Sequence, residues 1–310
     1  MKKQLLTLAL LAVAGTAGAQ QLPNGSFDEG DWVDCVPWTS GGNTSKYGTQ
    51  PKSWKISNVI GYLNQGKTIV GKEDAKGRTG KAVCVYNSPN TASSKGAIVP
   101  GYVTLGTPWN TAKAPEETEK DGGTFGGISF KNKPDALRFY YKRSVTGTNT
   151  RSSVVAYLWN GTTTQKKVPG NIGGSISLKK VTMTDRDINV LGMSTEGHQG
   201  GSVTARHKLI AKIESYTTEQ PTEWTEWTIP FDYVAENIGE TPEKINVIFA
   251  ASDYFNSSNV TDGVSMSIDD VELVYYSTLS SLKVNGTDIK LQDGVYEYNG
   301  VGSIANGCVV

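Results

Sequence analysis

Acidic side chains stand near both ends of a long region of alternating apolar residues. Asp28 follows an Asn-Gly-Ser-Phe run near the start, and Asp269 and Asp270 stand together near the end. Carboxylate and amide oxygens are the hard ligands that Ca²⁺ prefers. In a sandwich whose first and last strands pair, these segments become neighbours. The sequence therefore predicts a structural calcium site at Asp28, Asp269 and Asp270, with turn capping or solvation as the alternative.

Several tryptophans stand among glycine, proline, asparagine and threonine, a context typical of loops. Exposed aromatic rings stack on the apolar faces of sugars, and neighbouring polar groups bond to the hydroxyls. The residues that we expect to contact a carbohydrate ligand are Trp38, Trp54, Trp109, Asn110 and Arg138. The alternative is that these rings fill the core, because sandwiches also bury tryptophan for packing.

A glycosidase needs two carboxyl groups at a defined separation. The chain offers many acidic residues, but spacing along the sequence does not fix a distance across a sandwich, and most such side chains are solvated. The two histidines, His198 and His207, are too few for a zinc site and match no metalloprotease motif. We predict no catalytic residue, and hydrolysis by a carboxylate pair stays an alternative.

Residues 61–68 fit the phosphate-binding pattern G-x-x-x-x-G-K-[ST]. A functional loop of this kind leads directly into a helix, whose N-terminal amides hold the phosphates. Here Ile-Val-Gly follows, with further glycines beyond it, and such a sequence is unsuited to a helix. We interpret the segment as a glycine-rich hairpin and predict no nucleotide cofactor.

The composition favours an all-β protein. The 310 residues include 30 Lys and Arg against 30 Asp and Glu, together with 35 Gly, 14 Tyr and 7 Trp. A formal net charge of zero gives no electrostatic reason to expect nucleic acid or an anionic membrane as partner. The chain is too aromatic for a disordered protein and too rich in glycine for a helix bundle.

Short runs of alternating apolar residues support this class, since they are typical of sandwich strands with one buried face. They lie at 82–86, 137–141, 155–159, 227–231 and 245–251. Residues 203–216 fit both a strand and a helical face, and the neighbouring strands favour a strand. We predict a two-sheet antiparallel β-sandwich.

The run at 264–275 changes parity. Met266 and Ile268 share one face of a regular strand, whereas Val271 and Leu273 share the other. A regular strand cannot bury both sets on one side, but a β-bulge adds a residue and restores the match. The sequence therefore predicts a bulge at Asp269–Asp270.

The first segment has the features of a secretory signal peptide. Lys2 and Lys3 precede a short apolar run, and Ala17-Gly18-Ala19 forms a cleavage site. We predict a signal peptide at 1–19, a sandwich at 20–277 and a short C-terminal β segment at 278–310. The run is too short to span a bilayer. The protein is expected without membrane insertion, in the periplasm, on the outer cell surface or secreted.

Export permits a disulfide, and Cys35 with Cys84 is the natural pair. Cys84 also stands within an alternating strand, where a buried thiol is equally compatible. Both alternatives stay open at this point.

A series of motifs in fixed order gives the chain a family resemblance. They are the segments 24–27, 125–130, 133–142, 223–231 and 264–273. In this order they resemble the putative carbohydrate metabolism domain of exported gut Bacteroidetes proteins, over roughly residues 24–276. The resemblance implies a jelly-roll sandwich similar to carbohydrate-binding modules and galactose-binding-like domains, with a role in glycan handling.

The resemblance also implies that Asp28, Asp269 and Asp270 occupy the places that hold structural calcium in related jelly-rolls. The tail from Leu279 looks like the start of an Ig-like or similar module. The expected partners are a carbohydrate ligand and other cell-surface glycan-utilisation proteins. Our first hypothesis is an exported module that binds carbohydrate without cleaving it. A glycoside-active enzyme and a structural or adhesive surface protein are the alternatives.

Overall fold

The computed structural model describes residues 19–35, 48–59, 70–73, 78–89, 98–110, 122–161, 165–170, 179–184, 207–255, 259–276, 282–284, 287–289, 291–292 and 295–296. The chain forms two compact units. One comprises Gly18–Tyr275, and the other comprises Met1–Ala17 with Tyr276–Val310. Residues 1–18 of the predicted signal peptide, Trp38 and the glycine-rich segment 61–68 lie outside the described residues. Within the described residues, no helix has the length and apolar character needed to cross a bilayer.

One sheet of the larger unit has five antiparallel strands in the order β17-β12-β20-β5-β4. They are β17 (Thr225–Pro230), β12 (Ala136–Val145), β20 (Val264–Val274), β5 (Ala82–Tyr86) and β4 (Val70–Glu73). The central strands β12 and β20 pair over almost their full length, and β20 is the last strand of this unit.

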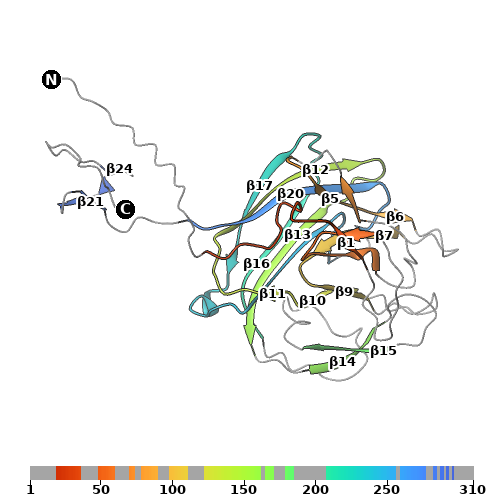
Figure 1. Ribbon diagram of the computed structural model, residues 1–310, viewed down its shortest axis with the longest axis horizontal. Helices are drawn as coiled ribbons and strands as arrows, with labels where there is room; N and C mark the ends of the chain where they lie inside the picture. Colours follow the sequence, from red (N-terminus) through yellow and green to blue (C-terminus); the bar gives the residue numbers. More distant parts are fainter. Residues whose placement is uncertain are drawn as a thin grey trace. The chain divides into compact units, whose positions relative to one another are not determined.

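The other sheet has seven strands, in the order β18-β16-β13-β19-β8-β3 with β11 also paired to β19. They are β18 (Asp232–Tyr233), β16 (His207–Thr217), β13 (Ser152–Gly161), β19 (Lys244–Ala250), β8 (Tyr102–Thr104), β3 (Lys55–Ile56) and β11 (Ile128–Ser129). The strand β16 confirms the strand interpretation of residues 203–216 for the part that is described. Figure 1 shows the long strands of both sheets.

Further short strands pair outside these two sheets. The pairs are β1 (Val33–Asp34) with β2 (Thr49–Gln50), β6 (Ser88–Pro89) with β7 (Ile98–Val99), β9 (Thr107–Asn110) with β10 (Gly122–Phe125), and β14 (Gln165–Gly170) with β15 (Lys179–Thr184). In the smaller unit β21 (Leu282–Val284) pairs with β22 (Thr287–Ile289), and β23 (Leu291–Gln292) with β24 (Val295–Tyr296). These last two pairs form the short C-terminal β segment.

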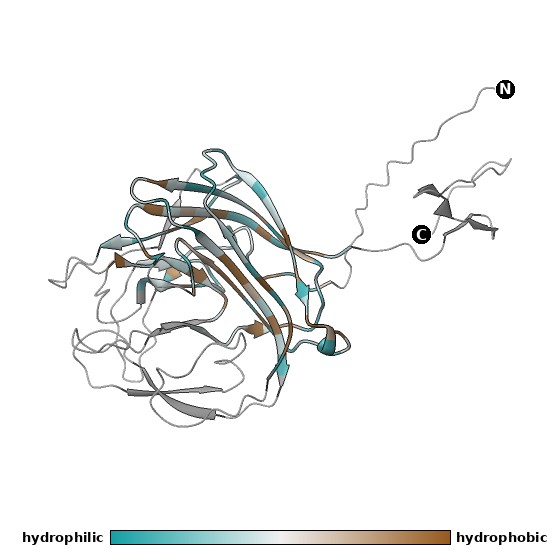
Figure 2. Cartoon of the chain, turned by 180° about the vertical axis from the view of Figure 1, so that it is seen from behind, coloured by the Kyte–Doolittle hydropathy of each residue, from teal (hydrophilic) through white to brown (hydrophobic). Residues whose placement is uncertain are grey.

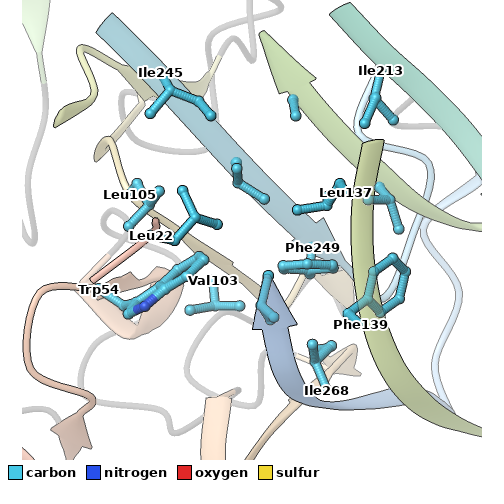
Figure 3. Packing of buried hydrophobic residues seen from close by; sticks show 14 of the residues in the cluster. Leu22, Trp54, Val103, Leu105, Leu137, Phe139, Ile213, Ile245, Phe249 and Ile268 are labelled. Atoms are coloured by element: carbon cyan, nitrogen blue, oxygen red, sulfur yellow. The ribbon is translucent and has the colours of Figure 1, made fainter. Parts of the chain in front are cut away.

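The main core lies between the two sheets. Phe139 of β12 and Phe249 of β19 meet there, with ring centroids 4.9 Å apart at an interplanar angle of 69°. Figure 3 shows these rings among aliphatic side chains from both sheets and from the N-terminal segment. Figure 2 shows that hydrophobic residues concentrate along the long strands. The predicted all-β, two-sheet antiparallel sandwich of jelly-roll type is confirmed.

Strand β20 contains the bulge that its sequence predicts. The register of β12 against β20 shifts between Arg138 and Tyr140, so β20 accommodates one extra residue. Asp270 takes a φ of 48°, in the left-handed region. As a result Ile268 and Val271 are both buried in the core despite their parity in the sequence.

No disulfide joins Cys35 and Cys84, both of which lie in the described part of the chain. Cys35 is buried, and burial raises the pKa of its thiol to about 12. A thiol with so high a pKa is inert at neutral pH, because the thiolate is the reactive form.

Candidate functional site

The face of the seven-stranded sheet that points away from the core carries a second buried layer. Side chains alternate along a strand, so Val154, Ala156 and Leu158 of β13 enter the core while Tyr157 and Trp159 point the other way. The buried members of this layer, which we call the second layer, are Tyr102, Val155, Tyr157, Trp159, Ile248 and Ala250, with Leu209 and Tyr254 packed against it. The expectation that the strand at 155–159 buries one face is therefore corrected, because both of its faces are covered.

A network of neutral polar side chains lies within the second layer. Asn246 is fully buried and accepts a hydrogen bond from the Thr104 hydroxyl at 2.8 Å. Its Nδ2 donates to Thr124 Oγ1 at 2.8 Å and to the Tyr157 hydroxyl at 2.9 Å. The Tyr254 hydroxyl accepts the backbone N–H of Thr124 at 2.7 Å. These bonds satisfy the buried amide and fix the positions of the two tyrosine rings.

One polar group of the second layer has no partner. The Trp159 side chain is fully buried, and among the described residues no acceptor lies within hydrogen-bonding distance of its indole Nε1. Its ring lies beside that of Tyr157, with centroids 4.9 Å apart at 41°. Buried donors without a partner are rare in folded proteins, and each one calls for an explanation.

The backbone passes close over the edge of the Trp159 ring between β10 and β11. A Cβ built on Gly127 would lie 2.8 Å from Trp159 Cη2 and 2.3 Å from the carbonyl oxygen of Ile245. Gly126 beside it takes a φ of 70°, which also favours glycine. The sequence Gly126-Gly127 is thus required by the close approach of this segment to the second layer.

The predicted ligand residues Trp109 and Asn110 lie on β9, which pairs with β10. Asn110 is opposite Gly122 and Trp109 is opposite Gly123. The next residue of β10, Thr124, makes the two hydrogen bonds that attach this strand pair to Asn246 and Tyr254 of the second layer. Figure 1 shows β9 and β10 on the side of β13 that faces away from β12 and β17. The structure thus brings Trp109 and Asn110 to the same side of the sandwich as the second layer.

Trp54, predicted to contact ligand, lies in the main core and has acceptors for its indole N–H within the protein. Its side chain is fully buried in the main core, where its ring packs edge-on against Phe27 with centroids 5.4 Å apart. Its indole N–H donates to the carbonyl oxygens of Pro23 and Asn24 at 3.0 and 3.2 Å. The composition around Trp54 is typical of a loop, but the N-terminal segment packs over this residue and buries it.

Arg138 lies on the outer face of the five-stranded sheet, because its neighbours Leu137 and Phe139 enter the core. Its guanidinium is half-exposed and is bonded to the Glu272 carboxylate. This face is across the sandwich from Trp109 and Asn110. Arg138 is therefore on a different face of the sandwich from these two predicted ligand residues.

A second polar cluster surrounds Tyr140 on the same outer face. The Tyr140 hydroxyl donates to Glu226 at 2.7 Å, and the Arg78 guanidinium carbon lies 3.8 Å from the centre of the Tyr140 ring. The pKa of the Glu226 carboxyl is lowered, mainly because its carboxylate accepts this hydrogen bond from Tyr140. Since Arg78 covers the ring, Tyr140 does not offer that ring face to a sugar.

Two of the three predicted calcium ligands face one loop. Asp28 Oδ1 accepts the backbone N–H of Lys81, and Asp269 Oδ2 accepts that of Arg78, both at 2.7 Å. Asp269 is fully buried, and this burial raises the pKa of its carboxyl to about 6 against the opposing effect of backbone amides. Backbone amides already bond to these carboxylate oxygens, and a structural calcium stays a prediction for which Asp28 and Asp269 are the residues that would hold it.

Asp270 does not join them. Its carboxylate forms an ion pair with the Arg78 guanidinium at 2.8 Å. Within the described part of the chain, no three His, Cys, Asp or Glu side chains gather into a metal-binding group. Of the three predicted carboxylates, Asp28 and Asp269 therefore face the loop at 78–81, whereas Asp270 pairs with Arg78 instead.

Several carboxylates of the described residues are held by neighbouring side chains. The Lys208 ammonium lowers the pKa of Glu240, the Tyr140 hydroxyl lowers that of Glu226, and Asp253 is bonded to Arg151 at 2.7 Å. A glycosidase acid needs a raised pKa together with access to substrate. Asp269 has the raised pKa but is fully buried.

Tyr157, Trp159 and Asn246 are not among the ligand residues that the sequence predicts. The signal that could have found them is Asn246, a lone amide in the otherwise apolar run at 245–251. A buried amide needs polar partners, so its presence in a core strand predicts a second polar layer.

Comparison with solved structures finds similarity to proteins from Bacteroides. The chain is 16% identical to a putative glycoside hydrolase from Bacteroides thetaiotaomicron, with 80% of this chain and 72% of that chain covered and a TM-score of 0.46. It is 14% identical to a putative glycoside hydrolase from Bacteroides vulgatus, with 83% and 98% covered and a TM-score of 0.43. A putative sugar binding protein from Bacteroides thetaiotaomicron is 12% identical, with 82% and 99% covered and a TM-score of 0.31.

No curated protein matches the chain at a significant level. Residues 26–274 match the family model described as the putative carbohydrate metabolism domain, and this match takes in the strands of both sheets from β1 to β20. The chain therefore belongs to the putative carbohydrate metabolism domain family.

Proposed function

We propose that this protein binds carbohydrate and does not cleave it. The observation that carries the proposal is the second layer, in which aromatic rings and a buried amide network lie under the β9–β10 pair. Aromatic faces beside neutral donors and acceptors suit a sugar, whose rings have apolar faces and hydroxyl edges. The exposed carboxyl groups of Glu226 and Glu240 have lowered pKa values, whereas the acid of a glycosidase needs a raised one, which favours binding over cleavage.

The proposal includes export, since residues 1–19 have the pattern of a signal peptide. The protein would then meet glycans outside the cytoplasm, beside other glycan-utilisation proteins of the cell surface. This part of the proposal rests on the sequence alone.

The proposal is tested by applying the mature protein to an array of dietary, host and bacterial glycans. We expect binding to at least one glycan, and no release of shorter products when the bound glycan is incubated with the protein for hours. Trp109→Ala should weaken binding about fivefold or more, because loss of one stacked ring removes a contact of about 1 kcal/mol or more.

The matched control is Trp224→Ala, which removes a half-buried aromatic ring beside Lys142 on the five-stranded sheet. Binding should survive this change. Release of products would establish a glycoside-active enzyme instead, and absence of binding across the array would favour the structural or adhesive alternative.

A further inference from the structure

We infer that the Trp159 indole N–H is a hydrogen-bond donor reserved for the ligand, and that the ligand group that accepts it is an uncharged oxygen of a neutral sugar. This inference rests on the proposed carbohydrate-binding function and names the group within the second layer that would recognise the sugar.

The first argument is the cost of the unpartnered donor. Trp159 is fully buried, and no acceptor among the described residues reaches its Nε1. A buried donor without a partner destabilises the folded state relative to an apolar side chain of similar shape. Phenylalanine would fill much of the same space without that cost. The presence of tryptophan at this position is therefore explained if a bound ligand accepts a hydrogen bond from its N–H.

The second argument is that the neighbouring polar groups already satisfy one another. Asn246 uses its carbonyl oxygen for Thr104 and its amino group for Thr124 and Tyr157. The Trp159 N–H is thus the donor of this layer that stays available to an incoming group. A ligand that supplies one acceptor there completes the hydrogen bonding of the second layer without breaking the network.

The third argument is the neutrality of the layer. Its buried members are aromatic, aliphatic, hydroxyl and amide side chains, and the half-buried Lys244, which pairs with Trp159 across the strands, is a cation at its edge. A carboxylate or sulfate placed among the buried members would lose its hydration without gaining a cationic partner from them. A hydroxyl or ring oxygen carries no such penalty. The layer therefore favours neutral glycans over uronic-acid or sulfated ones.

Access to Trp159 requires movement of its cover. The described cover is the segment at Gly126–Gly127 and the β9–β10 pair, which Thr124 attaches to the layer by its bonds to Asn246 and Tyr254. A sugar can reach the indole only if this segment lifts, so the inference includes that movement.

The inference is tested with the whole chain and two panels of probes. The neutral panel is xylan, galactan, mannan and β-glucan oligosaccharides, and the anionic panel is polygalacturonate and heparan sulfate. In a ¹H–¹⁵N spectrum assigned through the backbone, the Trp159 indole proton should move downfield when the bound neutral glycan is added, because it gains an acceptor. This measurement needs no variant.

Trp159→Phe removes the donor and keeps an aromatic ring. It should weaken binding of the neutral glycan about tenfold, whereas Trp227→Phe, which changes a partly buried tryptophan of the other sheet, should leave binding unchanged. Both variants are first shown to unfold cooperatively.

The outcomes separate the inference from the proposed function. Binding by the natural chain that Trp159→Phe leaves unchanged, or an indole resonance that does not move, overturns the inference and leaves the function standing. Selective binding of the anionic panel overturns the assigned ligand class. If no probe of either panel binds, the proposed function fails and the inference fails with it.

Discussion

Arg143 shows at the residue scale how the sandwich secures one of its ends. Its side chain is buried at 2% exposure, and burial lowers the pKa of its guanidinium. Its partners are neutral oxygens from Ser152, Asn149, Thr150, Thr218 and Glu219. The guanidinium therefore ties the end of β12 to the start of β13 and to the segment after β16.

We predict that Arg143→Lys lowers the free energy of unfolding by roughly 2–3 kcal/mol, because an ammonium cannot reach these diverging acceptors and leaves several unsatisfied. Urea denaturation with a common m-value measures the change. Arg138→Lys is the control, since that half-exposed ion pair is expected to contribute less than about 1 kcal/mol. Equal losses in the two variants would contradict this account of Arg143.

At the element scale, the bulge of β20 decides which residues of the last strand reach the core. It depends on Asp270, whose φ of 48° is costly for most residues and tolerable for Asp, Asn and Gly. Without the extra residue, Ile268 and Val271 could not both be buried.

We predict that Asp270→Val destabilises the protein by roughly 1–2 kcal/mol or more, because a β-branched residue is strained in the left-handed region. Asp270→Gly loses the same ion pair with Arg78 but keeps the backbone conformation, so its loss should stay below about 1 kcal/mol. Thermal and urea unfolding of the two variants separate these contributions. If both variants lose the same stability, the ion pair rather than the backbone is the important feature.

The whole larger unit is closed by contacts between its first and last segments. The loop of residues 78–81 lies between Asp28 of the N-terminal segment and Asp269 of β20, and its backbone amides bond to both carboxylates. Gly25 adds a backbone bond, since its carbonyl accepts the N–H of Val271 at 2.8 Å. A cation held here would stabilise the whole unit.

We predict that calcium raises the melting temperature of the chelator-treated protein by about 5 °C or more at a hundredfold excess over its dissociation constant. Asp28→Asn and Asp269→Asn should each abolish most of this increase, because each removes a charged ligand. Asp270→Asn should retain it, since the Asp270 carboxylate is engaged by Arg78. Differential scanning calorimetry checks all four proteins, and an increase that depends on Asp270 alone would contradict this assignment.

The sequence by itself determined the local features of this protein. Alternation with a period of two identified the strands, and the parity change between Ile268 and Val271 identified the bulge, because both depend only on neighbouring residues along one strand. The composition and the order of motifs led to the all-β class and to the family.

Only the tertiary structure decided which side chains share a face and which are covered. Trp54 has a loop-like context but is buried, because the N-terminal segment crosses the core. Arg138 and Trp109 are separated because their strands belong to different layers. Trp159 is buried without an acceptor because β10 and Gly127 pass over it. Alternation assigns a residue to one of two faces, but what covers that face depends on strand order and on segments distant in sequence.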